Sequence, residues 1–201
     1  VSINPVYSHF TYAKALFFTE KNTPEVQEKL KHELENKNIL VLGGGNSLVD
    51  LCSSETIKPK KIIDIDPFRV AESIGKGTNG NYQSFAYGAE DVDLAKKLSP
   101  FGLFDEIWAL YSVPHYLRTK EDIQNLFHNI EQLLAIGGTA RIHPLTINTD
   151  DLYEVLKSSG ETAFKNAAQD RIDAVIDSII DLEQKGFSVE IVKGTLLLKK
   201  P

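Results

Sequence analysis

The sequence has few of the features that mark a secreted or membrane-inserted protein. It contains a single cysteine, Cys52, among 201 residues, so no disulfide can form within the chain, which fits a reducing compartment. No apolar run approaches the roughly 20 residues that a membrane-spanning helix needs. A charged, then apolar, then small-residue leader is also lacking at the start of the chain. These absences predict a cytoplasmic protein with no membrane partner.

An excess of basic residues is lacking too. The chain carries 22 Lys and Arg against 28 Asp and Glu, a formal net charge of −6, and its basic residues are scattered. Proteins that bind nucleic acid normally present a basic face to the phosphates. No close spacing of the His-x-x-x-His kind groups the histidines, so no metal site is predicted. The composition therefore favours a small-molecule substrate and no nucleic-acid partner.

The most informative stretch is an apolar run over 38–42 that opens into Gly43–Gly45 and a helix-like segment. Glycine lets backbone amides approach a ligand closely, and a strand that ends in glycines before a helix is how α/β folds cradle nucleotide-like cofactors. A second apolar run over 61–65 ends in Asp64 and Asp66, about 20 residues on, where an acid meets a ribose. Together these runs predict an adenosine-containing cofactor across the carboxyl ends of two strands.

Apolar runs and helix-like segments alternate through the middle of the chain, which predicts a parallel sheet with right-handed crossovers. The expected strands are 38–42, 61–65, 82–87, 104–110 and 138–143, and the expected helices are 46–54, 67–74, 91–98 and 120–135. Another helix is expected before them, from the capping Thr23 and Pro24 to about Asn36. Gly137-Gly138 is expected to cap the end of the helix over 120–135.

Two further helices are expected after Pro144, over 150–159 and 168–185, with a polar stretch around Gly160 between them. The second has an apolar stripe that should pack against the sheet, made of Ile172, Val175, Ile176 and Ile179. Its other face has the spacing of a solvated surface and carries Asp170, Asp173, Asp177 and Asp181. Two β-type runs around Lys193-Gly194 predict a terminal hairpin.

Five segments in order resemble the motifs of the class I S-adenosylmethionine-dependent methyltransferases. They are 39–47, 63–67, 85–92, 104–112 and 130–140. The resemblance implies a single α/β domain over 1–201, a Rossmann-like three-layer sandwich whose mostly parallel seven-stranded sheet ends in an antiparallel C-terminal hairpin. Residues 1–36 would form a helical arm or lid, and 37–201 the core, with a helical insertion near 145–165.

The resemblance also implies a site for S-adenosyl-L-methionine. The expected cofactor-binding residues are Gly43, Gly44, Gly45, Asn46, Asp64, Ile65, Ala89, Glu90 and Leu110. Asp64 is favoured for the ribose and Asp66 for capping the next helix. The catalytic candidates are Tyr111 and His115, in the turn after the fourth strand. An imidazole has the right chemistry for a general base, although His115 could equally be a packing residue, and His143 is a second candidate.

The predicted function is methyl transfer to a small-molecule acceptor, an activity of the EC 2.1.1 type. The family usually carries an acid at Val41, a glycine at Ser47 and an Asp at Gly88, so a methyltransferase-like binding or scaffold protein stays open as an alternative. An NAD(P)-dependent oxidoreductase is a third reading, disfavoured because the loop lacks the last glycine of G-x-G-x-x-G. The acceptor pocket is expected between the turn Tyr111–Tyr116 and parts of 1–18 and 145–165.

Overall fold

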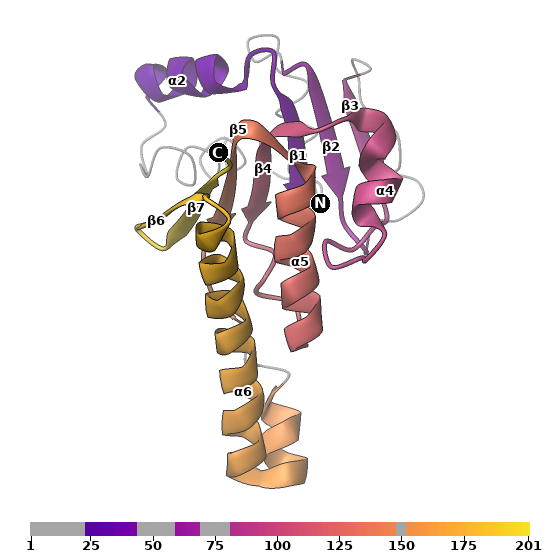
Figure 1. Ribbon diagram of the computed structural model, residues 1–201, viewed down its shortest axis with the longest axis vertical. Helices are drawn as coiled ribbons and strands as arrows, with labels where there is room; N and C mark the ends of the chain where they lie inside the picture. Colours follow the sequence, from indigo (N-terminus) through magenta and orange to yellow (C-terminus); the bar gives the residue numbers. More distant parts are fainter. Residues whose placement is uncertain (1–22, 44–58, 69–80, 148–151) are drawn as a thin grey trace.

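Seven strands form one sheet in the order β3-β2-β1-β4-β5-β7-β6 (Figure 1). The computed structural model describes residues 23–43, 59–68, 81–147 and 152–201. The strands are β1 Asn38–Leu42, β2 Lys61–Ile65, β3 Tyr82–Phe85, β4 Phe104–Leu110, β5 Leu134–His143, β6 Ser188–Val192 and β7 Thr195–Lys199. The helices are α2 Pro24–Leu34, α4 Leu94–Leu98, the 3₁₀ turn η2 Ser99–Phe101, α5 Lys120–Leu133 and α6 Leu152–Gln184.

The first five strands are parallel, and β7 pairs antiparallel with both β5 and β6. The predicted parallel sheet with a terminal hairpin is therefore confirmed. Strand β7 lies between β5 and β6, and β6 forms the edge of the sheet. Strand order reverses at β1, which lies between β2 and β4. Ligands of open α/β sheets bind at the carboxyl ends of the strands beside such a reversal, so this topology locates the place to look for a site.

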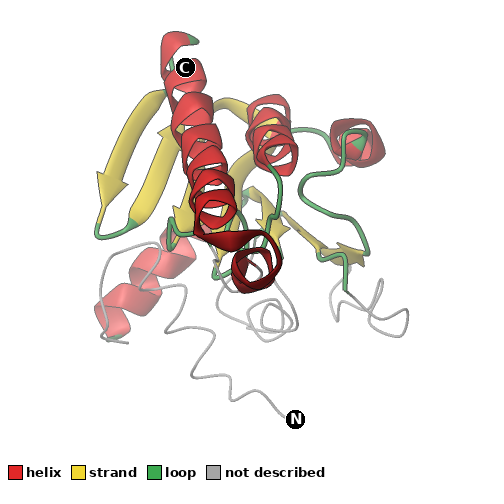
Figure 2. Ribbon diagram, turned by 90° about the horizontal axis from the view of Figure 1, so that it is seen from below, coloured by secondary structure: helices red, strands yellow, loops and turns green. Residues whose placement is uncertain are grey.

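The main core lies between the sheet and the helices α4, α5 and α6, which cover one face, while α2 lies on the other side (Figure 2). Strands of parallel sheets are usually covered on both faces, so their inner positions are mostly apolar. Strands β1 and β2 are buried from their second residue to their last, and Asp64 is the one polar residue among these positions. Helix α5 presents one apolar face to the core, made of Ile123, Leu126, Phe127, Ile130 and Leu133.

The start of α2 agrees with the predicted cap. Thr23 has an extended backbone and its hydroxyl accepts a hydrogen bond from the Val26 N–H at 3.4 Å, with Pro24 in the first turn. The helix ends at Leu34, two residues before the expected Asn36. The aromatic segment of the arm, over 1–22, lies outside the described residues.

The junction of α5 and β5 differs from the prediction. Gly137-Gly138 does not cap the helix, because α5 ends at Leu133 and the strand begins at once with Leu134. The last carbonyls of the helix instead accept hydrogen bonds from the Lys200 ammonium, at 2.7 Å from Glu131 and 2.9 Å from Leu134. A side chain from the far end of the chain therefore replaces the expected glycine cap.

Helix α6 also departs from the prediction. The backbone breaks only at Gly160, with φ 84°, and helix resumes directly after it, without a polar gap before 168. Val175 is buried and Ile179 is half-buried, but Ile172 and Ile176 are 42% and 48% exposed, so the prediction that all four isoleucine and valine side chains are buried is wrong. The first part of α6 projects beyond the carboxyl edge of the sheet, where no strand lies beneath it (Figure 1). No helix among the described residues is both long and apolar enough to cross a bilayer.

The hairpin follows its local sequence. Lys193 and Gly194 both have positive φ, 49° and 77°, as a two-residue turn that matches the strand twist requires. Strand β7 carries Leu196 and Leu198, which are both fully buried. Strand β6 is more exposed to solvent, and its Ser188 and Glu190 side chains are exposed. The more apolar arm therefore takes the inner position of the sheet.

Candidate functional site

A pocket of about 390 Å³ opens at the carboxyl ends of β1, β2 and β4, where the strand order reverses. Its walls are Gly43, Ile65, Asp66, Pro67, Phe68, Ala89, Glu90, Tyr111, Ser112, Val113, Tyr116 and Leu117. The volume falls within the range of small-molecule sites, and the walls combine aromatic and aliphatic side chains with two carboxylates, Asp66 and Glu90. Because the sequence predicts a cofactor site at this place, we call this cavity the cofactor pocket.

The cofactor pocket unites five of the predicted site residues: Gly43, Ile65, Ala89, Glu90 and Tyr111. Gly44, Gly45 and Asn46 lie outside the described residues. Leu110 is half-buried at the end of β4 and is not among the described walls. His115 belongs to the same turn as Tyr111 but lies just outside the pocket, and Asp64 is treated below.

Gly43 is the residue at which β1 and the turn after β4 approach most closely. Its φ is 74°, its N–H donates to the Ile65 carbonyl at 2.7 Å, and a Cβ at this position would lie 2.6 Å from the Ser112 Cβ. Ser112 is held there because its hydroxyl donates to the Leu42 carbonyl at 2.5 Å. Both the backbone conformation and the close contact require glycine, and together they shape the floor of the cofactor pocket.

Gly43→Ala is expected to lower the free energy of unfolding by about 2 kcal/mol, because a left-handed backbone costs a non-glycine residue about 1–2 kcal/mol and the Ser112 contact adds to it. Urea denaturation measures the loss. In a Ser112→Gly background the same substitution should cost less, since the clashing Cβ is gone. An equal cost in both backgrounds would show that the close contact has no part in the effect.

The two acids of β2 occupy different environments. Asp64 is fully buried in the strand, and its Oδ2 accepts a hydrogen bond from the Tyr82 hydroxyl on β3 at 2.8 Å. Asp66 follows the strand and lines the cofactor pocket, while its Oδ1 accepts a hydrogen bond from the Phe68 N–H at 2.9 Å. The burial of Asp64 argues against the predicted ribose contact, and Asp66 is the acid of this strand that reaches the pocket.

The loop between β3 and α4 is held by a buried polar side chain that the sequence reasoning missed. Asn129 on α5 donates through Nδ2 to the carbonyls of Ala89 and Asp91, each at 2.9 Å. This loop makes β3 and α4 shorter than predicted, and it brings Ala89 and Glu90 to the pocket wall. The sequence does contain a signal for this contact: Asn129 is an asparagine in the otherwise apolar stripe of α5. A buried amide needs hydrogen-bond partners.

Glu90 and Asp91 follow closely on Gly88, where the family usually carries an Asp, so either acid could take the place of that side chain. The Glu90 carboxylate lies over Gly88, with Oε1 2.5 Å from where a Cβ would stand. Asp91 is engaged elsewhere: it pairs with Lys97, whose ammonium hydrogen bond holds the pKa of Asp91 below its ordinary value. Of the two, Glu90 is therefore the acid available to the cofactor pocket.

The turn after β4 carries the two catalytic candidates. Tyr111 has a positive φ of 55°, which is uncommon for a bulky residue, and its ring meets the edge of His143 at 5.2 Å between centroids. His115 Nδ1 lies 3.0 Å from the Thr146 hydroxyl, and its ring packs edge-on against Tyr116. His143 is buried, with Nδ1 2.8 Å from the Thr195 hydroxyl. Of the two histidines, His115 is the more accessible to a reactant.

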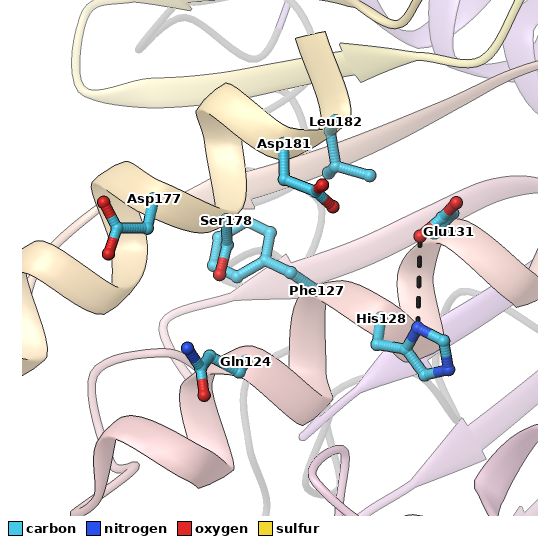
Figure 3. A pocket seen from close by; sticks show the side chains of 8 residues that line it. All are labelled: Gln124, Phe127, His128, Glu131, Asp177, Ser178, Asp181 and Leu182. Carbon is cyan, nitrogen blue, oxygen red and sulfur yellow. Dashed lines mark ion pairs between the residues drawn. The ribbon is translucent and has the colours of Figure 1, made fainter. Parts of the chain in front are cut away.

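A smaller cavity of about 240 Å³ lies between α5 and α6, away from the carboxyl edge of the sheet (Figure 3). His128 and Glu131 of α5 face each other there, and Asp177 and Asp181 come from α6. The Lys185 ammonium bridges Glu131 and Asp181 at 2.8 Å each, and these hydrogen bonds, that to Asp181 first, raise the pKa of Lys185. No cluster of three metal-binding side chains occurs in the part of the chain that the structure describes. Glu131 and Asp181 therefore act as partners of a surface lysine.

The fold of the chain resembles that of solved proteins, although comparisons of its sequence found no match. No protein-family model and no curated protein matches the chain. The MycE methyltransferase of the mycinamycin biosynthetic pathway, solved with magnesium, S-adenosylhomocysteine and mycinamycin VI, matches with a TM-score of 0.58 at 12% identity, over 96% of this chain and 54% of MycE. A second crystal form of MycE, with magnesium and S-adenosylhomocysteine, gives 0.59 at 11% identity, over 96% and 53%.

A protein from Clostridium thermocellum assigned as an rRNA methylase matches with a TM-score of 0.52 at 16% identity, over 90% of this chain and 97% of that one. The chain spans about half the length of MycE but nearly the whole of the clostridial protein. At such identities the likeness concerns the fold alone. With its strand order and its antiparallel β7, the chain has the Rossmann-like fold of class I S-adenosylmethionine-dependent methyltransferases.

Proposed function

We propose that the chain binds S-adenosyl-L-methionine in the cofactor pocket and transfers its methyl group to a small-molecule acceptor. The observation that carries the proposal is the convergence of Gly43, Ile65, Ala89, Glu90 and Tyr111 on one cavity. These residues come from separate segments of the chain. Gly43, Ile65, Ala89 and Glu90 were expected to bind this cofactor, and Tyr111 was expected to be a catalytic residue. The pocket also fits the ligand in kind, with a glycine at its floor where a Cβ would clash with Ser112, and with two carboxylates on its wall.

The residues of the proposed site would have separate chemical roles. Asp66 would accept hydrogen bonds from the ribose hydroxyls and Glu90 from the adenine amino group, because both carboxylates line the pocket. S-adenosyl-L-methionine supplies an electrophilic methyl group on a sulfonium. In the tautomer in which His115 Nδ1 donates to Thr146, Nε2 carries the lone pair that takes a proton from the acceptor. Orientation of the acceptor supplies much of the remaining rate.

Calorimetry with S-adenosylmethionine, S-adenosylhomocysteine and NADH tests the cofactor. We expect the first two to bind and NADH not to bind. Binding of NADH alone would favour the oxidoreductase, and no binding of either adenosyl ligand at millimolar concentration would overturn the proposal. Binding without methyl transfer to any acceptor would favour the scaffold alternative.

Asp66→Ala is expected to weaken S-adenosylhomocysteine binding by about 10- to 150-fold, since a charge-assisted hydrogen bond contributes about 1.5–3 kcal/mol. Asp64→Asn is the matched comparison, because it keeps the shape of the buried side chain beside Tyr82 and should leave affinity nearly unchanged. Calorimetry on both variants decides between the acids. The reverse ranking would return the ribose contact to Asp64.

A further inference from the structure

A third cavity, of about 460 Å³, lies beside the projecting part of α6. Its walls are Pro114, Leu145, Thr146, Ile147, Ala168, Ile172, Val175 and Ile176. Thr146 is the one polar side chain among these walls, and none of them is charged. We call this cavity the α6 groove. Its walls join Ile172 and Ile176, which α6 leaves 42% and 48% exposed, to other apolar side chains in one continuous surface, and such apolar surfaces mark ligand-binding grooves.

The α6 groove and the cofactor pocket share a wall element. The turn after β4 gives Val113 and Tyr116 to the cofactor pocket and Pro114 to the groove. His115 lies between these residues in the chain, and its Nδ1 is 3.0 Å from the hydroxyl of Thr146, which lines the groove. The candidate base therefore stands on the segment that the two cavities have in common.

We propose that the α6 groove binds the methyl acceptor, and that the acceptor is an uncharged, mainly apolar small molecule with a reactive hydroxyl, such as a phenol. This inference rests on the proposed function. The acceptor oxygen forms a bond to the methyl carbon as the sulfur–carbon bond breaks and its electron pair returns to sulfur. The hydroxyl proton passes to Nε2 of His115, so the products are a methyl ether, neutral S-adenosylhomocysteine and an imidazolium.

The chemistry of the described walls argues against charged acceptors. Burying a charged group without a partner is costly, and the described walls offer neither a cation for a carboxylate or phosphate nor an anion for an ammonium. A volume of about 460 Å³ suits a small molecule and not a folded macromolecule. The polar groups beside the groove, Thr146 and His115, suit a single hydroxyl.

The test uses 2-naphthol, an uncharged fluorescent phenol, titrated into the full chain with saturating S-adenosylhomocysteine. Ile176→Asp should weaken 2-naphthol binding by about tenfold or more, because it puts a carboxylate on an apolar wall. Ile180→Asp is the matched control: Ile180 is 44% exposed on the same helix, four residues on, and does not line the groove. The Ile180→Asp variant should bind 2-naphthol with the wild-type affinity. Both variants should keep the wild-type affinity for S-adenosylhomocysteine, measured by calorimetry.

The outcomes separate this inference from the proposed function. If S-adenosylhomocysteine binds but 2-naphthol does not, or if both aspartate variants lose it equally, the groove assignment is overturned and the cofactor proposal stands. Wild-type protein that binds 2-naphthol but neither adenosyl ligand would overturn the acceptor role together with the proposed function. A dimer in sedimentation that Ile176→Asp dissociates would identify a second copy of the chain as the occupant and overturn the acceptor assignment.

Discussion

His115→Ala is expected to lower the rate of methyl transfer to a phenolic acceptor by about 10²–10⁴-fold, the usual contribution of a general base. The affinity for S-adenosylhomocysteine should barely change, because His115 does not line the cofactor pocket. The rate of S-adenosylhomocysteine formation measures turnover.

His128→Ala is the control, because His128 is a 58% exposed histidine on α5, remote from the turn after β4. It should keep the wild-type rate of methyl transfer. If His115→Ala kept full turnover, His115 would be a packing residue held by Thr146 and Tyr116, and catalysis would depend on orientation of the acceptor alone.

Glu106→Ala is expected to lower the free energy of unfolding by about 3 kcal/mol. Glu106 is buried on β4, and its carboxylate binds the Lys37 ammonium at 3.3 Å and the Arg141 Nε and Trp108 Nε1 at 3.2 Å each. Removing one partner of a buried ion pair costs about 3–5 kcal/mol, because the remaining charge stays desolvated. We expect Glu106→Ala to lie at the lower end of this range, because the Lys37 side chain is 31% exposed.

Glu33→Ala provides the control for Glu106→Ala. Glu33 pairs with the same Lys37 ammonium, also at 3.3 Å, but its side chain is 44% exposed. An exposed pair contributes about 0–1 kcal/mol, so its removal should have little effect in the same chemical denaturation. Equal losses for the two variants would contradict a buried charge cluster at Glu106.

Three strands were predicted with their observed bounds, 38–42, 61–65 and 104–110. The hairpin turn at Lys193-Gly194 and the Thr23 cap were also predicted from the sequence. These features depend on neighbours within a few residues: an apolar run bounded by turn residues, a pair of residues that accept positive φ, and a hydroxyl two or three residues before free N–H groups. Such local patterns are complete in the sequence itself.

The site was predicted only in part, for a physical reason. Alternate residues of a strand point to opposite faces, so the position of the acid relative to the strand end decides whether it reaches a ligand. Asp64 lies within β2 and turns to Tyr82, 18 residues away, whereas Asp66 lies beyond the strand and reaches the pocket. The motif contains both acids, and its pattern alone does not distinguish their roles. The position at which β2 ends and the contact of Asp64 with Tyr82 on β3 distinguish them.

The sequence by itself determined the parallel sheet, the glycine directly after β1 and the hairpin, because each depends on short-range patterns of apolar residues and turn formers. The tertiary structure alone decided which groups meet. Lys200 caps α5 across 66 residues at Leu134, Asn129 holds the loop of Ala89 from 40 residues away, and Ile176 faces a groove because α6 projects beyond the sheet. These contacts join residues far apart in the chain, so their partners are fixed by packing and not by any local pattern.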